Sequence, residues 1–202
     1  MPSPPQPAPS SVADLAALGR LWDEHRGRLT AMLERRIDPA LRQRIGADEV
    51  LQSTFLDAAR DWAAYQHGSS MKPYAWLYRL ALDRLIEEHR KHTRGGRDLK
   101  LDLPWPDDYS AVLGEQLADR GTGPLTAAQR AELVDRVNRV IALLPKADRD
   151  LLQMRYFDQL SAQEIGDVYS LSENAVNVRI FRALKKLQQF WSQLFGKPES
   201  AS

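Results

Sequence analysis

The sequence predicts an all-α protein built from two small helical domains, and three observations carry this prediction. Apolar residues recur at steps of three and four over long stretches, and no alternating strand pattern stands out. Between Gly95 and Pro124, glycine, proline and aspartate interrupt the helical periodicity repeatedly. Capping residues or proline stand near several helix starts. The expected helices cover residues 12–36, 40–45, 48–65, 73–93, 126–143, 147–157, 162–170 and 173–194.

The N-terminal domain is expected over residues 12–96, after a disordered proline-rich tail at 1–11. Its last helix opens with Pro73, which is favourable in a first helical turn. The helix at 48–65 has an apolar and a polar face. The residues expected to face inward are Val50, Leu51, Phe55, Ala58, Ala59 and Trp62, and those expected on the polar face are Glu49, Gln52, Asp57, Arg60 and Asp61.

A flexible acidic linker is expected over residues 97–125. Residues 97–128 hold six acidic and three basic side chains, so an acidic segment separates two mildly basic ones. The net charge of the whole chain is only +1. This small charge argues against a protein that coats DNA without sequence preference, because such binding depends on an excess of cations.

The C-terminal domain is expected over residues 126–195, followed by a disordered tail at 196–202. Its second half is predicted to form a helix-turn-helix. Ser161 and Glu164 form a capping box for the first helix, and Ser172 caps the second. Two helices this close in sequence must cross steeply. A continuous buried stripe is expected on the second helix at Val176, Ile180, Ala183, Leu184, Leu187, Trp191 and Leu194.

The face of this helix opposite the stripe carries residues suited to contact with DNA. At about 100° per residue, the side chains on or beside that face are Asn174, Asn177, Val178, Phe181, Arg182, Lys185, Lys186 and Gln189. Val178 and Phe181 are apolar where water is expected, and base edges offer thymine methyl groups as partners. Arg182 is placed to reach guanine or phosphate. The alternatives are a face that is simply solvated, or a Phe181 that packs on a neighbouring domain.

A second cluster of aromatic and basic residues lies in the N-terminal domain. Its aromatic members are Trp62, Tyr65, Tyr74, Trp76 and Tyr78, and its basic members are Arg79, Arg84, Arg90, Lys91, Arg94 and Arg97. Aromatic rings beside cations can hold single-stranded nucleic acid. Helical spacing offers another interpretation, in which most of the rings belong to the core and only one or two contact nucleic acid.

Composition excludes several other classes of protein. The chain has no cysteine, which excludes disulfides, zinc fingers and thiol catalysis. His89 and His92 lie one turn apart, yet no third ligand is suggested, so neither a metal nor a cofactor is expected. The N-terminus has no signal-peptide pattern, and no apolar run approaches the roughly 18 residues of a membrane span. A cytoplasmic protein without a membrane partner is expected.

Three separated stretches then match one family in order. They are DEVLQSTFL at residues 48–56, WLYRLA at 76–81 followed by Arg90, and residues 144–183, where Leu144, Pro145, Arg149, Leu152 and the run RYF at 155–157 precede the helix-turn-helix. These stretches resemble the polymerase-binding helix, the minus-10 helix and the minus-35 domain of the extracytoplasmic-function group of the sigma-70 family. Members of this family are the promoter-recognition subunits of bacterial RNA polymerase.

The resemblance implies a role for each stretch. The first domain would dock on the clamp helices of the largest polymerase subunit through Asp48, Glu49, Gln52 and Asp57. The minus-10 element would be read by Trp76, Arg79, Asp83, Arg84 and Arg90, with a flipped base held by this helix and the adjoining loop. The minus-35 duplex would be bound by Asn174, Asn177, Val178, Phe181, Arg182 and Lys185. The resemblance also implies contact with the polymerase flap, a linker that threads toward the RNA exit channel, and an anti-sigma factor as a further partner.

Four positions depart from the family pattern. Asp83 stands where the family usually has asparagine, and Glu87 stands where aspartate is common. A carboxylate at 83 can accept a hydrogen bond from the amino group of cytosine but cannot donate one. The smaller departures are Ser170 in place of glycine and Gly166 in place of alanine.

The sequence therefore predicts an alternative sigma factor that binds core polymerase, recognises a two-part promoter and has no chemistry of its own. The main alternative is a conventional helix-turn-helix regulator that binds duplex DNA as a dimer without polymerase. A small helical enzyme is a weaker alternative, because no convergent acid, base or metal cluster can be assembled from four scattered histidines.

Overall fold

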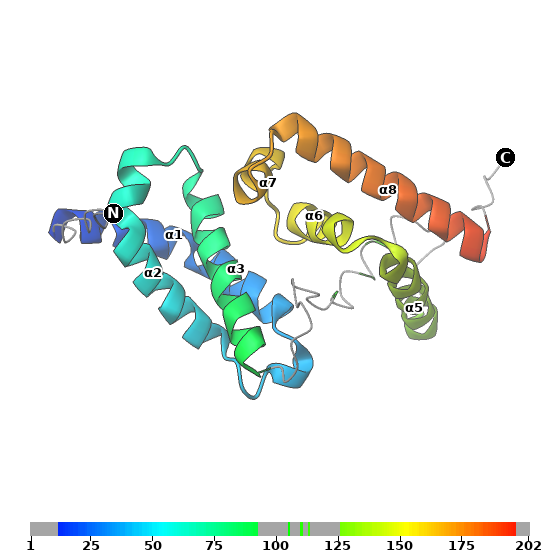
Figure 1. The fold of residues 1–202 in the computed structure, drawn as a ribbon. Helices are drawn as coiled ribbons and strands as arrows, with labels where there is room; N and C mark the ends of the chain where they lie inside the picture. The colour runs from blue at the N-terminus through cyan, green and yellow to red at the C-terminus, as the bar shows by residue number, and fades with distance from the viewer. Residues whose placement is uncertain (1–11, 93–104, 106–109, 111–112, 114–125, 197–202) are drawn as a thin grey trace. The chain divides into compact units, whose positions relative to one another are not determined.

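The computed structural model describes residues 12–92, 105, 110, 113 and 126–196 (Figure 1). Its elements are α1 (Val12–Arg36), η1 (Pro39–Leu41), α2 (Ala47–Gly68), α3 (Pro73–His92), α5 (Ala127–Leu143), α6 (Lys146–Tyr156), α7 (Ala162–Tyr169) and α8 (Glu173–Phe195). The described residues contain no strand, which confirms the predicted all-α class.

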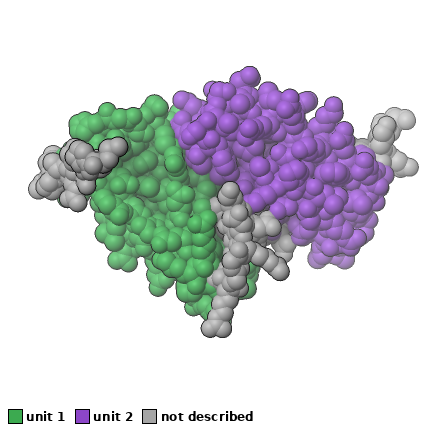
Figure 2. Space-filling view, in the orientation of Figure 1, with its two compact units in different colours: residues 1–103 green, residues 104–202 purple. Residues whose placement is uncertain are grey.

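The chain divides into two compact units, residues 1–103 and 104–202, coloured green and purple in Figure 2. The predicted tails at 1–11 and 196–202 lie outside the described residues, except for Gly196, which is the C-cap of α8.

Unit 1 is a three-helix arrangement in which α1, α2 and α3 pack against one another (Figure 1). Each helix is amphipathic and contributes one apolar stripe to the common core. Leu29, Leu77 and Leu85 are fully buried members of this core. Arg36 is also buried, and its guanidinium carbon lies 5.8 Å from the centroid of the Tyr78 ring.

The predicted helix at 40–45 is wrong. The segment forms only the single 3-10 turn η1, whose start is capped by the Asp38 side chain, which accepts from the Ala40 amide at 2.8 Å. The amides of Arg44 and Ile45 then both donate to the Leu41 carbonyl at 2.8 Å. So short a segment forms too few hydrogen bonds to offset the free-energy cost of helix nucleation. Gly46 is already the N-cap of the next helix, α2.

An ion pair joins α2 to α3 inside unit 1. The Asp57 carboxylate accepts from Arg84, through Nε to Oδ2 and through Nη2 to Oδ1, the latter at 2.6 Å. Arg60 also contacts Asp57 from the same helix. Asp57 is 7% exposed, so its predicted place on the polar face of α2 is wrong. Burial is tolerated because two arginines supply the opposite charge.

Unit 2 contains α5, α6, α7 and α8, and the long helix α8 packs against each of the other three (Figure 1). Two arginines of the α6 region hold the connections between helices. Arg149 donates to the Leu144 carbonyl at 3.1 Å, just after α5, and Arg155 donates to the Leu160 carbonyl at 3.1 Å, just before α7. Arg149 and Arg155, which belong to the stretch 144–183 quoted for the family resemblance, therefore stabilise the fold of unit 2.

Three positions inside the predicted linker are described, and two of them, Trp105 and Ser110, contact residues of unit 2. The Trp105 ring meets the Phe157 ring edge to face, with centroids 5.2 Å apart. Ser110 is buried and its hydroxyl donates to the Asn138 side chain, and Leu113 is 6% exposed. At these positions the expectation of a free tether is wrong. The rest of the segment 97–125 lies outside the described residues.

Replacing Asp57 with alanine should lower the free energy of unfolding by about 1–3 kcal/mol, because Arg84 loses the carboxylate that binds it from α2. Urea denaturation followed by circular dichroism measures the change. Asp61→Ala on the same helix is the matched control, since its side chain is 52% exposed, and it should change stability by no more than about 0.5 kcal/mol. Equal stability of the two variants would contradict the role assigned to the ion pair.

Candidate functional site

The helix-turn-helix formed by α7 and α8 has the predicted start signals. The Ser161 hydroxyl accepts from the Glu164 amide at 3.1 Å, and the Glu164 carboxylate accepts from the Ser161 amide at 2.7 Å, which completes the capping box. Ser172 caps α8 by accepting from the Ala175 amide at 3.2 Å. These bonds satisfy helix amides that otherwise have no partner, and they set the rotational phase of both helices.

The turn between α7 and α8 depends on a close backbone approach. Ser170 adopts the left-handed conformation, with φ 56° and ψ 46°, which costs a non-glycine residue roughly 1 kcal/mol. The Leu171 amide donates to the Gly166 carbonyl at 2.9 Å. A Cβ atom at position 166 would lie 2.5 Å from the Leu171 carbonyl oxygen, a distance that real Cβ atoms do not show. Gly166, a minor departure by sequence, is therefore required by the geometry of this turn.

The outward face of α8 carries all six residues predicted to bind the minus-35 element. The exposed side chains are Asn174, Asn177, Val178, Phe181, Arg182 and Lys185. Phe181 is 68% exposed and Val178 is 40% exposed, although both are apolar. This combination of amide, cationic and apolar groups on one helical face matches the groups that base edges and phosphates offer in a major groove.

Five of the seven residues of the stripe predicted on the opposite side of α8 are buried, and Leu184 is half-buried. Val176, Ile180, Ala183, Leu187 and Trp191 are buried. Leu194 is 50% exposed, so its predicted burial is wrong. The flanking Lys186 forms an ion pair with Asp148 of α6 at 2.6 Å, which ties α8 to the rest of unit 2.

Three of the five residues predicted to read the minus-10 element share one exposed face of α3. Arg79, Asp83 and Arg90 are exposed and lie within about 40° of one another around the helix. Trp76 is 8% exposed and lies in the core, so it is not available to DNA in this structure. Arg84 is half-buried and binds Asp57 and Glu87, the latter at 2.6 Å.

Two effects act on the pKa of the Asp83 carboxyl in opposite directions. Although the residue as a whole is exposed, partial burial of its carboxyl raises the pKa above the ordinary value, and the positive charge of Arg79 acts in the opposite direction. A raised pKa means that the ionised form is disfavoured at this position relative to water. The acidic departure from the family pattern thus lies on the exposed face of α3, beside Arg79.

The aromatic cluster of unit 1 forms a stack that is internal to the fold. The Tyr65 ring lies 4.1 Å from the Trp76 ring, centroid to centroid, at an angle of 14°. Trp62 stacks on Tyr65 with centroids 5.7 Å apart. These rings join the end of α2 to the start of α3, which confirms that aromatic residues of this cluster serve the core.

The exposed face of α2 carries Asp48, Glu49 and Gln52, as predicted for polymerase binding, whereas Asp57 faces inward. Leu56, one turn after Gln52, is 62% exposed. No role for Leu56 was predicted from the sequence. The signal that could have found it is a large apolar residue lying between polar ones on the outer face of an amphipathic helix.

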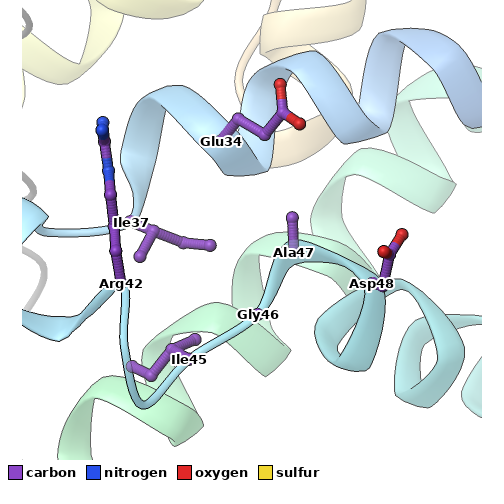
Figure 3. A pocket seen from close by; sticks show the side chains of 7 residues that line it. All are labelled: Glu34, Ile37, Arg42, Ile45, Gly46, Ala47 and Asp48. Carbon is purple, nitrogen blue, oxygen red and sulfur yellow. The ribbon is translucent and has the colours of Figure 1, made fainter.

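Two hollows border this face of α2. The first, of about 490 Å³, is lined by Glu34, Ile37, Arg42, Ile45, Gly46, Ala47 and Asp48 (Figure 3). In Figure 3 it lies between the end of α1 and the start of α2. The second, of about 410 Å³, is lined by Ser53, Leu56, Asp57, Arg60 and Arg84.

The part of the chain that the structure describes holds no cluster of three or more metal-ligating side chains. Burial lowers the pKa of His89, which favours its neutral form. Among the described residues, no helix has the length and apolar character needed to cross a membrane.

Two sequence models of one protein family match the chain. The model described as "Sigma-70 region 2" matches residues 21–95, and the model described as "Sigma-70, region 4" matches residues 135–187. The first range contains most of α1 and all of α2 and α3, and the second contains α6, α7 and most of α8. The two matches therefore fall on the two units separately.

Individual relatives agree with these models. The chain is 27% identical to the ECF RNA polymerase sigma factor SigW of Bacillus subtilis, over 71% of this chain and 74% of that protein. It is 29% identical to the RNA polymerase sigma-H factor of Pseudomonas aeruginosa, over 71% and 72%, and 27% identical to the ECF RNA polymerase sigma factor SigD of Mycobacterium tuberculosis, over 90% and 80%. A solved structure of CnrH in complex with the cytosolic domain of CnrY aligns with 89% of this chain and 90% of that chain, at 22% identity and a TM-score of 0.47.

Replacing Gly166 with alanine should destabilise unit 2 by about 1–3 kcal/mol, because the new methyl group overlaps the Leu171 carbonyl. Thermal unfolding monitored by circular dichroism reports the change. Gly27→Ala is the control, since nothing lies within 4 Å of a Cβ at that position of α1, and alanine should be neutral or stabilising there. If both variants melt at the wild-type temperature, the close approach at the turn is not a constraint.

Proposed function

The chain belongs to the sigma-70 family of RNA polymerase sigma factors, and from that premise we propose how its two units share promoter recognition. It is an alternative sigma factor of the extracytoplasmic-function group, which directs transcription initiation by core polymerase. We propose that unit 1 docks on the polymerase and binds the minus-10 element, while unit 2 binds the minus-35 element. The bond-forming chemistry belongs to the polymerase, and we assign no catalytic residue to this chain.

The observation that carries the minus-35 assignment is the exposed face of α8. Phe181 and Val178 expose apolar surface beside Arg182, and Asn174 and Asn177 add amide groups that pair well with base edges. The ion pair between Lys186 and Asp148 holds this helix on its unit without using the cations of the outward face. The face is therefore free to enter the major groove as a rigid element.

The minus-10 assignment rests on the exposed stripe of α3. Arg79 and Arg90 can neutralise phosphates, and Asp83 lies between them along the same face. A carboxylate accepts hydrogen bonds from the exocyclic amino groups of cytosine but repels phosphate. We therefore propose that Asp83 contacts a base edge and that its two neighbouring arginines contact the backbone. Arg84, which binds Asp57, supports the helix from behind.

Polymerase docking is assigned to the outer face of α2, and the clamp helices of the largest subunit are the proposed partner. Asp48, Glu49 and Gln52 supply polar contacts at the start of the helix, and Leu56 supplies an apolar one. An exposed leucine beside a recess suits an interface whose centre excludes water. In this proposal Leu56 contacts polymerase and Asp57 does not, because the Asp57 carboxylate is already paired with Arg84 and Arg60.

Run-off transcription from genomic fragments, with purified core polymerase in the presence and absence of this protein, tests the proposed function. Protein-dependent start sites that share two upstream elements are the expected result. A conventional regulator would instead bind duplex DNA tightly by itself and create no new start sites. That outcome would overturn the proposed function.

Replacing Arg182 with alanine should weaken binding of the reconstituted holoenzyme to a minus-35 element by about 1–3 kcal/mol. Fluorescence anisotropy on a labelled promoter duplex measures this loss, and a separate titration measures core affinity, which should not change. Arg139→Ala is the control, because Arg139 is an exposed arginine of α5 in the same unit and is paired with Asp135. An equal loss of core affinity in Arg182→Ala would contradict the assignment of α8.

Replacing Leu56 with alanine should lower the affinity for core polymerase by about 1–2 kcal/mol, since the side chain loses apolar contact at the interface. The fold should be unaffected because Leu56 is 62% exposed. Leu15→Ala, which changes another exposed leucine of unit 1, is the control. If the two variants bind core polymerase equally well, Leu56 lies outside the interface.

A further inference from the structure

We propose that Tyr65 is a positioning residue that holds residues 69–72, the segment between α2 and α3, in the conformation that captures a strand-separated minus-10 base. This inference rests on the proposed function of unit 1. It assigns a role to a side chain that neither the family resemblance nor the exposed faces single out. The role is carried by one hydrogen bond and two ring contacts.

The hydrogen bond ties the segment back to α2. The Tyr65 hydroxyl donates to the Met71 carbonyl at 3.0 Å, across six residues of chain. The Met71 amide donates to the Ser69 hydroxyl at 3.1 Å, and the Ser69 amide donates to the Tyr65 carbonyl at 3.1 Å. The segment is closed at its far side by the Trp76 amide, which donates to the Lys72 carbonyl at 3.0 Å.

The ring of Tyr65 is held in place by its own contacts. One face stacks on Trp76 at the start of α3, with centroids 4.1 Å apart, and Trp62 lies 5.7 Å away. Trp76 and Trp62 are both at least nine-tenths buried. The ring therefore cannot leave to stack on a base without opening this cluster. The fixed ring sets the direction of the Tyr65 hydroxyl. The hydroxyl in turn holds the Met71 carbonyl in place.

The segment so held presents polar groups to solvent. The exposed side chains around it are Gln66, His67, Ser69 and Ser70. A loop that must adopt one conformation to bind loses affinity when that conformation has to be ordered during binding. The Tyr65 hydrogen bond orders the segment beforehand. Its contribution should appear in single-strand binding and not in duplex binding by unit 2.

The test compares Tyr65→Phe with wild type in the reconstituted holoenzyme. The variant keeps the ring stack and loses only the hydroxyl. The probe is the fluorescein-labelled non-template minus-10 strand of a promoter found by the run-off assay. We expect its affinity to fall about two- to tenfold, the range for loss of one hydrogen bond. Ser69→Ala, which removes the other side-chain bond to Met71, should lower the same affinity.

Two further measurements separate positioning from general stability. Core affinity and binding of a minus-35 duplex should match wild type in both variants, and Tyr156→Phe, a change of an exposed tyrosine of unit 2, should alter none of these values. Wild-type affinity of Tyr65→Phe for the single strand would overturn the inference and leave the proposed function intact. A parallel loss of core affinity and melting temperature would overturn it in favour of a purely structural role. Failure of the wild-type protein to create any start site would instead remove the proposed function itself.

Discussion

Burial of one stripe on each helix is the constraint on which both proposed binding faces depend. In units of three or four helices, each helix has a single core-facing side, and the rotation that buries it also decides which residues face outward. In α8, burial of Val176, Ile180 and Ala183 forces Phe181 and Arg182 into solvent. In α3, burial of Leu77, Ala81 and Leu85 likewise turns Arg79, Asp83 and Arg90 outward. The recognition surfaces are therefore consequences of core packing.

This dependence explains why so much could be predicted from the sequence. Helix phase is encoded locally, by caps such as Ser161 and Ser172 and by apolar spacing within one turn, and such signals act over three or four residues. The boundaries of α7 and α8 and the six outward residues of α8 follow from them. The family resemblance, which depends on the same short stretches, added the functional meaning.

The residues that could not be predicted are those whose surroundings come from another helix. Asp57 occupies a polar position of α2 by spacing, yet Arg84 arrives from α3, 27 residues later, and draws it into the fold. Trp76 lies on the same side of α3 as Asp83, but the rings of α2 cover it. The failed helix at 40–45 has a local cause, since only residues 42–46 separate the 3-10 turn at Pro39–Leu41 from the start of α2, which leaves too little chain for another helix. The close approach at Gly166 depends on the path of the turn after α7, which brings the Leu171 carbonyl back toward position 166.

The distribution of charge explains how a nearly neutral chain can serve promoter recognition. Affinity for DNA depends on the number of phosphates that cations neutralise, and the net charge here is only +1. Several arginines are already occupied within the fold, including Arg84 with Asp57, Arg149 with the Leu144 carbonyl and Arg155 with the Leu160 carbonyl. In the proposed function, the exposed cations of α3 and α8 orient the protein on DNA, while the small net charge limits its non-specific affinity. A sigma factor benefits from this balance, because its proposed attachment to core polymerase supplies the affinity and restricts promoter binding to the holoenzyme.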